Sequence, residues 1–151
     1  MTYYPDLDRE TASVLGEAVR AVGWLALGHA YPKGPTAAEF VSALTIFRNS
    51  WGTIFQVLPG WPACMGMHQC EICDDEGDSG DIAIPSGDVL FVAPTMIVHY
   101  VRVHGYLPPV DFVRAVLACP APTTAAYADA VTAIANRGAG ALRSPHGCVL
   151  E

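Results

Sequence analysis

Residues 64–104 decide the fold class, and they read CMGMHQCEICDDEGDSGDIAIPSGDVLFVAPTMIVHYVRVH. The stretch opens with a cysteine cluster, and two apolar runs around the turn Pro85-Ser86-Gly87 predict a β-hairpin. A helix is predicted from Met96 to His104, ended by a glycine, although its β-branched residues also allow a strand. A cysteine turn, a hairpin and then a helix is the order of a treble-clef-like zinc module. We therefore expect an α+β fold, small and mostly helical, with a β-hairpin and a zinc site.

The cysteines and histidines of this stretch have the spacing of metal ligands, in the pattern Cys64-x3-His68-x-Cys70-x2-Cys73 and, after 25 intervening residues, His99-x4-His104. A Cys-x2-Cys turn can direct two thiolates at one ion at about 2.3 Å, and a His pair near a helix end completes a tetrahedral zinc site. Two thiolates and two neutral imidazoles balance the charge of Zn²⁺. The sequence therefore predicts one Zn²⁺ held by Cys70, Cys73, His99 and His104.

The histidine pair leaves an alternative open. Positions five apart on an ideal α-helix are about 140° from each other, so His99 and His104 share one ion only if the helix tightens or ends near Gly105. Otherwise His68 replaces His104, and Cys64 is a packed thiol. Reduced cysteines also pack as small hydrophobic side chains, so buried thiols and histidines without a metal are the competing interpretation.

Acidic residues around the cysteines suggest two further roles. Glu71 lies between Cys70 and Cys73, where a carboxylate can act as a general base or hydrogen-bond a metal ligand. The acidic run at residues 74–81 lacks the ligand spacing of a calcium loop and is interpreted as a solvated turn.

Outside this stretch, the apolar spacing predicts helices. The first covers residues 8–22, and the second begins after a Thr36 cap with Phe40, Leu44 and Phe47 on its buried face. Pro108-Pro109 opens a third, and the fourth ends near Gly138. In the third helix the buried face is expected to carry Phe112, Val113, Val116 and Leu117. In the fourth helix it is expected to carry Tyr127, Val131 and Ile134. Residues 53–58 fit either a strand or irregular packing. We expect one zinc-binding domain at 1–138 and a flexible tail at 139–151, whose last residues are interpreted as a tag remnant.

Composition excludes several classes of protein. The 151 residues are 52% hydrophobic and 15% charged, which requires a packed core and rules out general disorder. The net charge of −7 and the absence of a basic run argue against nucleic acid and anionic membranes as partners. Neither a signal peptide nor a membrane span is visible, so a cytoplasmic location is expected. The low charge content favours a protein partner or a homodimer.

Several blocks of sequence carry a resemblance to a known family: Tyr4-Pro5-Asp6-Leu7, Val22-Gly23-Trp24-Leu25, Tyr31-Pro32-Lys33-Gly34, Gly66-x-His68-x-Cys70-Glu71-x-Cys73, Ala93-Pro94-x-Met96-Ile97-x-His99-Tyr100-Val101 and His104-x-Tyr106-x-Pro108-Pro109-x-x-Phe112. Over residues 3–117 the chain resembles a bacterial family of short stand-alone proteins classed as a domain of unknown function. The resemblance implies that His68, Cys70, Cys73, His99 and His104 belong to one constellation, and it implies no activity.

Two functions remain from these observations. In the first, the Cys/His site stabilises the fold of an interaction or accessory protein. In the alternative, three protein ligands and a water hold the zinc of a mononuclear metalloenzyme, and Glu71 or the unused histidine transfers protons. A third interpretation, that the protein is an acidic inhibitor of a basic toxin, rests on charge and size alone.

Overall fold

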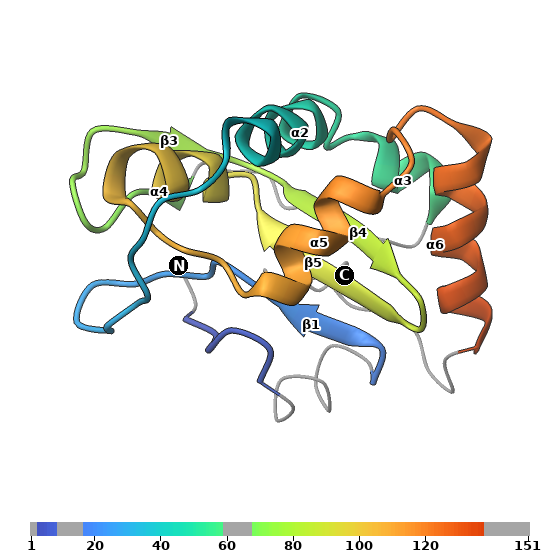
Figure 1. Ribbon diagram of the computed structural model, residues 1–151, viewed down its shortest axis with the longest axis horizontal. Coiled ribbons are helices and arrows are strands. Elements are labelled where there is room, and N and C mark those ends of the chain that lie inside the picture. Colours follow the sequence, from blue (N-terminus) through green and yellow to red (C-terminus); the bar gives the residue numbers. More distant parts are fainter. Residues whose placement is uncertain (1–2, 9–16, 59–67, 138–151) are drawn as a thin grey trace, which may run out of the picture.

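A three-stranded sheet forms the centre of the fold in the computed structural model, which describes residues 3–8, 17–58 and 68–137 (Figure 1). Its strand order is β1-β5-β4. β4 and β5 form an antiparallel hairpin, and β1 pairs with β5 in parallel. The strands are β1 (Val19–Ala21), β4 (Asp81–Ser86) and β5 (Val89–Pro94). β5 is therefore the central strand, and it is almost entirely buried.

The hairpin predicted from the sequence is confirmed, with its turn shifted by two residues. Pro85 was expected in the turn, but it lies within β4 opposite Leu90. β4 is an edge strand, where a residue without a backbone N–H is tolerated. The turn is instead made at Gly87 and Asp88, and Gly87 has a φ of 58°, which glycine adopts without steric cost.

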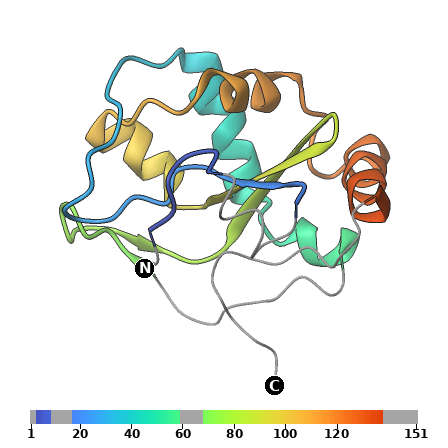
Figure 2. The same cartoon turned by 90° about the horizontal axis from the view of Figure 1, so that it is seen from below.

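Helices cover one side of the sheet, as Figure 2 shows for α2, α4 and α5. Phe40 of α2 and Phe91 of β5 both pack edge-on against Phe112 of α5. α6 packs against β4, where the Tyr127 hydroxyl donates a 2.7 Å hydrogen bond to the Ala83 carbonyl. The helix bounds are α2 (Ala38–Asn49), α3 (Thr53–Val57), α4 (Ile97–His104), α5 (Val110–Ala118) and α6 (Ala125–Arg137). This mixture of helices and sheets confirms the expected α+β class.

A second, two-stranded sheet lies beside α4 (Figure 1). It pairs β2 (His68–Gln69) with β3 (Gly77–Asp78) in antiparallel fashion. The acidic run at residues 74–81 was predicted to be a solvated turn. Residues 77–78 of this run form β3, and residues 74–76 and 79 lie next to the small sheet. The short sheet thus holds together the two ends of the segment that carries Cys70 and Cys73.

The first predicted helix is wrong where the structure describes it. Val19–Ala21 form strand β1, and residues 17–18 form a turn, while 9–16 lie outside the described residues. The apolar residues of this stretch fit helical spacing, but they fit a buried strand equally well. Pairing with Leu90–Val92 decides the outcome, because it satisfies the backbone of the otherwise unpartnered side of β5.

The other helix predictions hold with two corrections. α2 begins at Ala38 after an Ala37 cap residue with no side-chain hydrogen bond, so Thr36 is not its cap. In α5, Leu117 is 50% exposed, because Phe112, Ala115 and Val116 occupy the inward face. The undecided residues 53–58 are helical over α3. The predicted tail lies outside the described residues. Within the described ranges, every helix is too short or too polar to cross a membrane.

Candidate metal centre

Four side chains that are far apart in sequence converge beside α4. They come from the cysteine turn after β2 and from the two ends of α4: Cys70, Cys73, His99 and His104. One potential ligand atom from each lies within 4.8 Å of all the others. Cys70 and His99 are buried, and the other two are partly buried. This group could hold a metal ion.

The cysteine turn is shaped by its backbone. The Cys70 N–H donates to the Glu76 carbonyl at 2.7 Å, and the Asp74 N–H donates to the Cys70 carbonyl at 2.9 Å. Asp74 has a φ of 62°, in the left-handed region that aspartate tolerates better than most residues. These contacts close a tight turn in which Cys70 and Cys73 face the same side. The turn is continuous with the pairing of β2 and β3.

The end of α4 brings the two histidines together. The Gly105 N–H bonds to the Tyr100 carbonyl, five residues back, and the Tyr106 N–H bonds to the same oxygen at 3.1 Å. These bonds and the left-handed φ of Gly105 close the helix immediately after His104. The helix therefore ends next to Gly105, as predicted. The ring centroids of His99 and His104 are 4.9 Å apart.

The distances within the group are short and similar. The Nε2 atoms of His99 and His104 are 3.2 Å apart. Cys70 Sγ lies 3.4 Å from Nε2 of His104, and Cys73 Sγ lies 3.4 Å from Nε2 of His99. Both imidazoles therefore direct their Nε2 atoms toward a common centre, where the two Sγ atoms also lie.

Glu76 contacts the other side of His99, and the sequence analysis did not identify it. Its Oε2 lies 3.0 Å from Nδ1 of His99, while Nε2 of that ring faces the centre. The buried Nδ1 does not point directly at this oxygen, so the contact falls short of a hydrogen bond in geometry. Glu76 is 61% exposed, and a small rotation of its side chain would complete the bond. A carboxylate in this place fixes the orientation and tautomer of a ligating histidine.

The surroundings shift the pKa of Cys70 and that of His104. Burial raises the pKa of the Cys70 thiol most, and hydrogen bonds from the backbone of Cys73 and Ile72 oppose this rise. Burial, with smaller effects from His99 and Lys33, lowers the pKa of His104 and favours the neutral imidazole. A neutral histidine is the form that binds a metal.

The segment after α4 is fixed to the N-terminal part of the chain. Tyr106 is fully buried, and its hydroxyl donates a 2.7 Å hydrogen bond to Oδ2 of Asp6. The other oxygen of Asp6 accepts from the Gly23 N–H at 2.9 Å. The Gly34 N–H also donates to the Gly105 carbonyl at 3.0 Å. The two residues that follow His104, Gly105 and Tyr106, are thus fixed by hydrogen bonds, and they hold His104 in position.

The remaining candidates lie elsewhere. His68 is on β2 and is outside the group of four, so the structure does not bring it into the place of His104. Glu71 is exposed. Cys64 and Cys148 lie outside the described residues, and Cys119 follows α5, away from the centre. The acidic residue beside the site is Glu76. No sequence motif predicts its contact with His99, because only the fold of the cysteine turn brings the two side chains together.

Comparison with known proteins identifies the family. A family model described as Domain of unknown function (DUF7919) matches residues 2–117. The chain belongs to the DUF7919 family. This confirms the resemblance to a domain of unknown function. The matched range includes all four side chains of the candidate metal centre of the DUF7919 chain and most of α5. No curated protein and no solved structure matches it.

Proposed function

We propose that the centre is a structural zinc site, and the observation that carries this proposal is the spacing of the four ligand atoms. In a tetrahedron with Zn–S bonds of about 2.3 Å and Zn–N bonds of about 2.0 Å, the S···N edges are about 3.5 Å and the N···N edge is about 3.3 Å. The corresponding distances here are 3.4 Å and 3.2 Å. Three of the six edges therefore match a tetrahedron around one zinc ion, and the other edges are no longer than 4.8 Å, which supports the proposal.

The set of ligands supports a structural rather than a catalytic role. Four protein side chains fill a tetrahedron, whereas catalytic zinc sites keep one position for water or substrate. Two thiolates and two imidazoles also leave no net charge on the ion, which suits a site containing the buried Cys70 and His99. The ion would join the cysteine turn to both ends of α4.

We further propose that the zinc-stabilised end of the protein serves protein interaction, in the cytoplasm. Its cysteine turn exposes the acidic side chains of Glu71, Asp74, Asp75 and Glu76. α4 exposes Val103, which is 61% accessible, nearby in the same part of the fold. An acidic surface with an apolar neighbour fits a basic protein partner better than nucleic acid or an anionic membrane. A treble-clef-like arrangement is consistent with the order of cysteine turn, hairpin and helix.

The metalloenzyme remains the alternative function. It requires one of the four side chains to leave the ion so that water can bind, with Glu71 or the released histidine transferring protons. A cavity beside His99 is the observation that favours it. The exposure of Glu71 to solvent counts against it, because a general base must face the water on the ion.

The test is metal analysis of tag-free, full-length protein together with single variants. We expect about one zinc per chain, bound by two sulfur and two nitrogen atoms in X-ray absorption spectra. Cys73→Ala and His104→Ala should both lose zinc on dialysis. His68→Ala is the matched control, a histidine outside the group, and should retain it.

The outcomes separate the two functions. Zinc with three protein ligands and one water, and retention of zinc by His104→Ala, would overturn the structural site in favour of the enzyme. A protein that is folded and free of metal as isolated and that binds no added zinc would overturn both.

A further inference from the structure

A cavity of about 450 Å³ lies next to the metal centre, on the side of His99 that carries Glu76. One face of α4 forms one wall, through Val98, Arg102 and Val103. The end of α2 contributes Arg48, and the segment through β3 contributes Glu76 and Asp78. Its volume falls within the range of about 300–1,000 Å³ that is usual for small-molecule sites.

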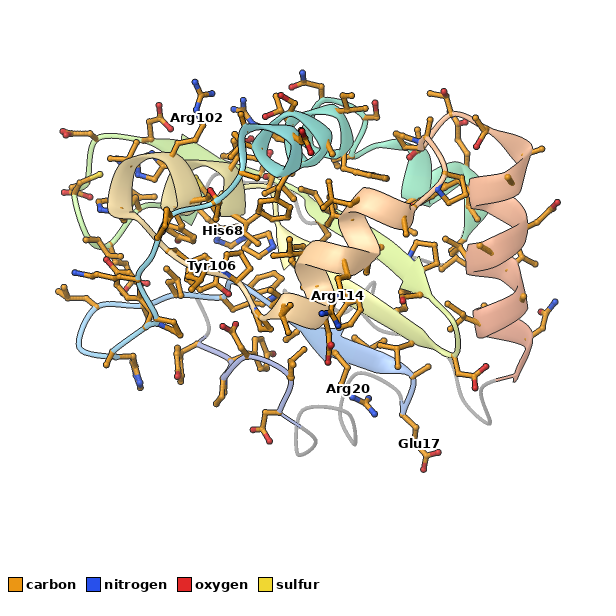
Figure 3. The ribbon with its side chains drawn as sticks, viewed as in Figure 1. Glu17, Arg20, His68, Arg102, Tyr106 and Arg114 are labelled. Carbon is orange, nitrogen blue, oxygen red and sulfur yellow. The ribbon has the colours of Figure 1, made fainter. Side chains whose placement is uncertain are left out.

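The cavity contains two cationic side chains in a chain that has few. Arg48 and Arg102 are two of only eight lysines and arginines in a protein with a net charge of −7. The cavity also contains the carboxylates of Glu76 and Asp78, so an anion would be held there by individual guanidinium groups and not by a net positive charge. Figure 3 shows Arg102 on α4, far from Arg114 on α5.

The two carboxylates of the cavity each have a neighbour within the protein. Oδ2 of Asp78 accepts from Nε of Arg48 at 3.0 Å, and its Oδ1 accepts from the Ser79 N–H at 2.8 Å. Oε2 of Glu76 lies against His99. In contrast, Arg102 makes no hydrogen bond or ion pair within the part of the chain that the structure describes, and Arg48 uses only its Nε there. The donors left for a ligand are therefore guanidinium groups.

We propose that this cavity binds a small organic molecule carrying an oxyanion, either a carboxylate or a phosphate. Arg102 and the Nη groups of Arg48 hold its oxygens, because a guanidinium matches both anions with paired N–H donors. Val98 and Val103 contact the apolar part of the molecule. The cations are not metal ligands, so this site is independent of the identity of the ion at the neighbouring centre.

The experiment uses ¹⁵N-labelled, full-length protein as isolated, with its metal content measured on the same sample. Hexanoate, inorganic phosphate and the neutral hexanamide are titrated separately, and amide chemical shifts are followed. We expect saturable shifts at residues 95–103 with at least one of the two anions and not with hexanamide. Arg102→Gln should raise the Kd at least about tenfold. Arg114→Gln is the control, because it removes the same charge from an exposed position on α5 outside the cavity and should leave the Kd unchanged.

Each outcome decides the proposal. Binding of hexanoate alone assigns a carboxylate ligand, and binding of phosphate alone assigns a phosphorylated one. The proposal is overturned if neither anion gives saturable shifts at residues 95–103, or if hexanamide binds as tightly as hexanoate. Equal weakening by the two arginine variants would also overturn it, since net charge alone would then account for binding. The metal content shows independently whether the zinc proposal holds.

Discussion

At the scale of single residues, Glu76 connects the two halves of the metal centre. Its carbonyl accepts from the Cys70 N–H, and its carboxylate lies 3.0 Å from Nδ1 of His99. A carboxylate in this position supports the orientation of the imidazole ring. Truncation of Glu76 removes this support while leaving the backbone hydrogen bond intact.

We therefore expect Glu76→Ala to weaken zinc binding about tenfold, the lower end of the usual range, because the carboxylate is largely exposed to water. Competition with a chromophoric chelator measures the change. Glu71→Ala is the control, an exposed glutamate in the same turn, and should have little effect. Equal zinc affinity in the two variants would show that Glu76 does not position His99.

Tyr106 supports the centre from a greater distance. Its buried hydroxyl donates to the Asp6 carboxylate, and burial raises the pKa of Tyr106, which keeps the hydroxyl protonated as a donor. Tyr106→Phe should lower the free energy of unfolding by about 1.5–2 kcal/mol, the value of a hydrogen bond to a charged group.

Urea denaturation measures this loss as a lower midpoint with an unchanged slope. Tyr31→Phe is the comparison variant, because the Tyr31 hydroxyl makes no hydrogen bond within the described residues. It should unfold at nearly the midpoint of the unmodified protein. A Tyr106→Phe midpoint that matches the Tyr31→Phe midpoint would contradict the assigned bond.

At the scale of elements, the end of α4 at Gly105 makes the histidine pair usable. Gly105 has a φ of 64°, where an alanine costs about 1–2 kcal/mol. Gly105→Ala should therefore reduce stability and also weaken zinc binding, because relief of the strain moves His104.

Gly28→Ala is the matched control for this variant. Its φ of 87° is also positive, and a Cβ at either glycine meets open space. Both variants should lose similar stability in thermal melts, but only Gly105→Ala should release zinc more readily to a chelator. Equal zinc affinity in the two variants would mean that the turn does not set the position of His104.

The elements also show what the sequence could and could not predict. The stripe of Phe40 and Leu44 was predictable because its spacing matches a helix, and the hairpin was predictable because two apolar runs flank a Pro-Ser-Gly sequence. Residues 19–21 were not, because their apolar spacing fits both a helix and a buried strand, and only pairing with β5 selects the strand. The grouping of Cys70 with His104 followed from motif spacing. The contact of Glu76 with His99 did not, because it depends on how the cysteine turn closes.

At the scale of the whole molecule, the cysteine turn joins the main core through few residues. The three-stranded sheet and its covering helices bury a large apolar core, which includes Cys70 and contacts Ile72 and Cys73. The rest of the turn is held by a two-residue pairing of β2 with β3, by the Arg48–Asp78 ion pair and by contacts to α4. The stability of the protein should therefore be uneven, with the ion supporting its weaker end.

Removal of zinc by a chelator should consequently lower the melting temperature and open the molecule locally. In hydrogen exchange, the amides of Cys70, Asp74 and Tyr106 should lose protection, since their hydrogen bonds lie in the turn and at the end of α4. The amides of Val22 and Leu90 should stay protected, because they bond within the main sheet to Val92 and Ala18. Simultaneous loss at all five amides would contradict a local role, since it would mean that the main core cannot fold without the ion.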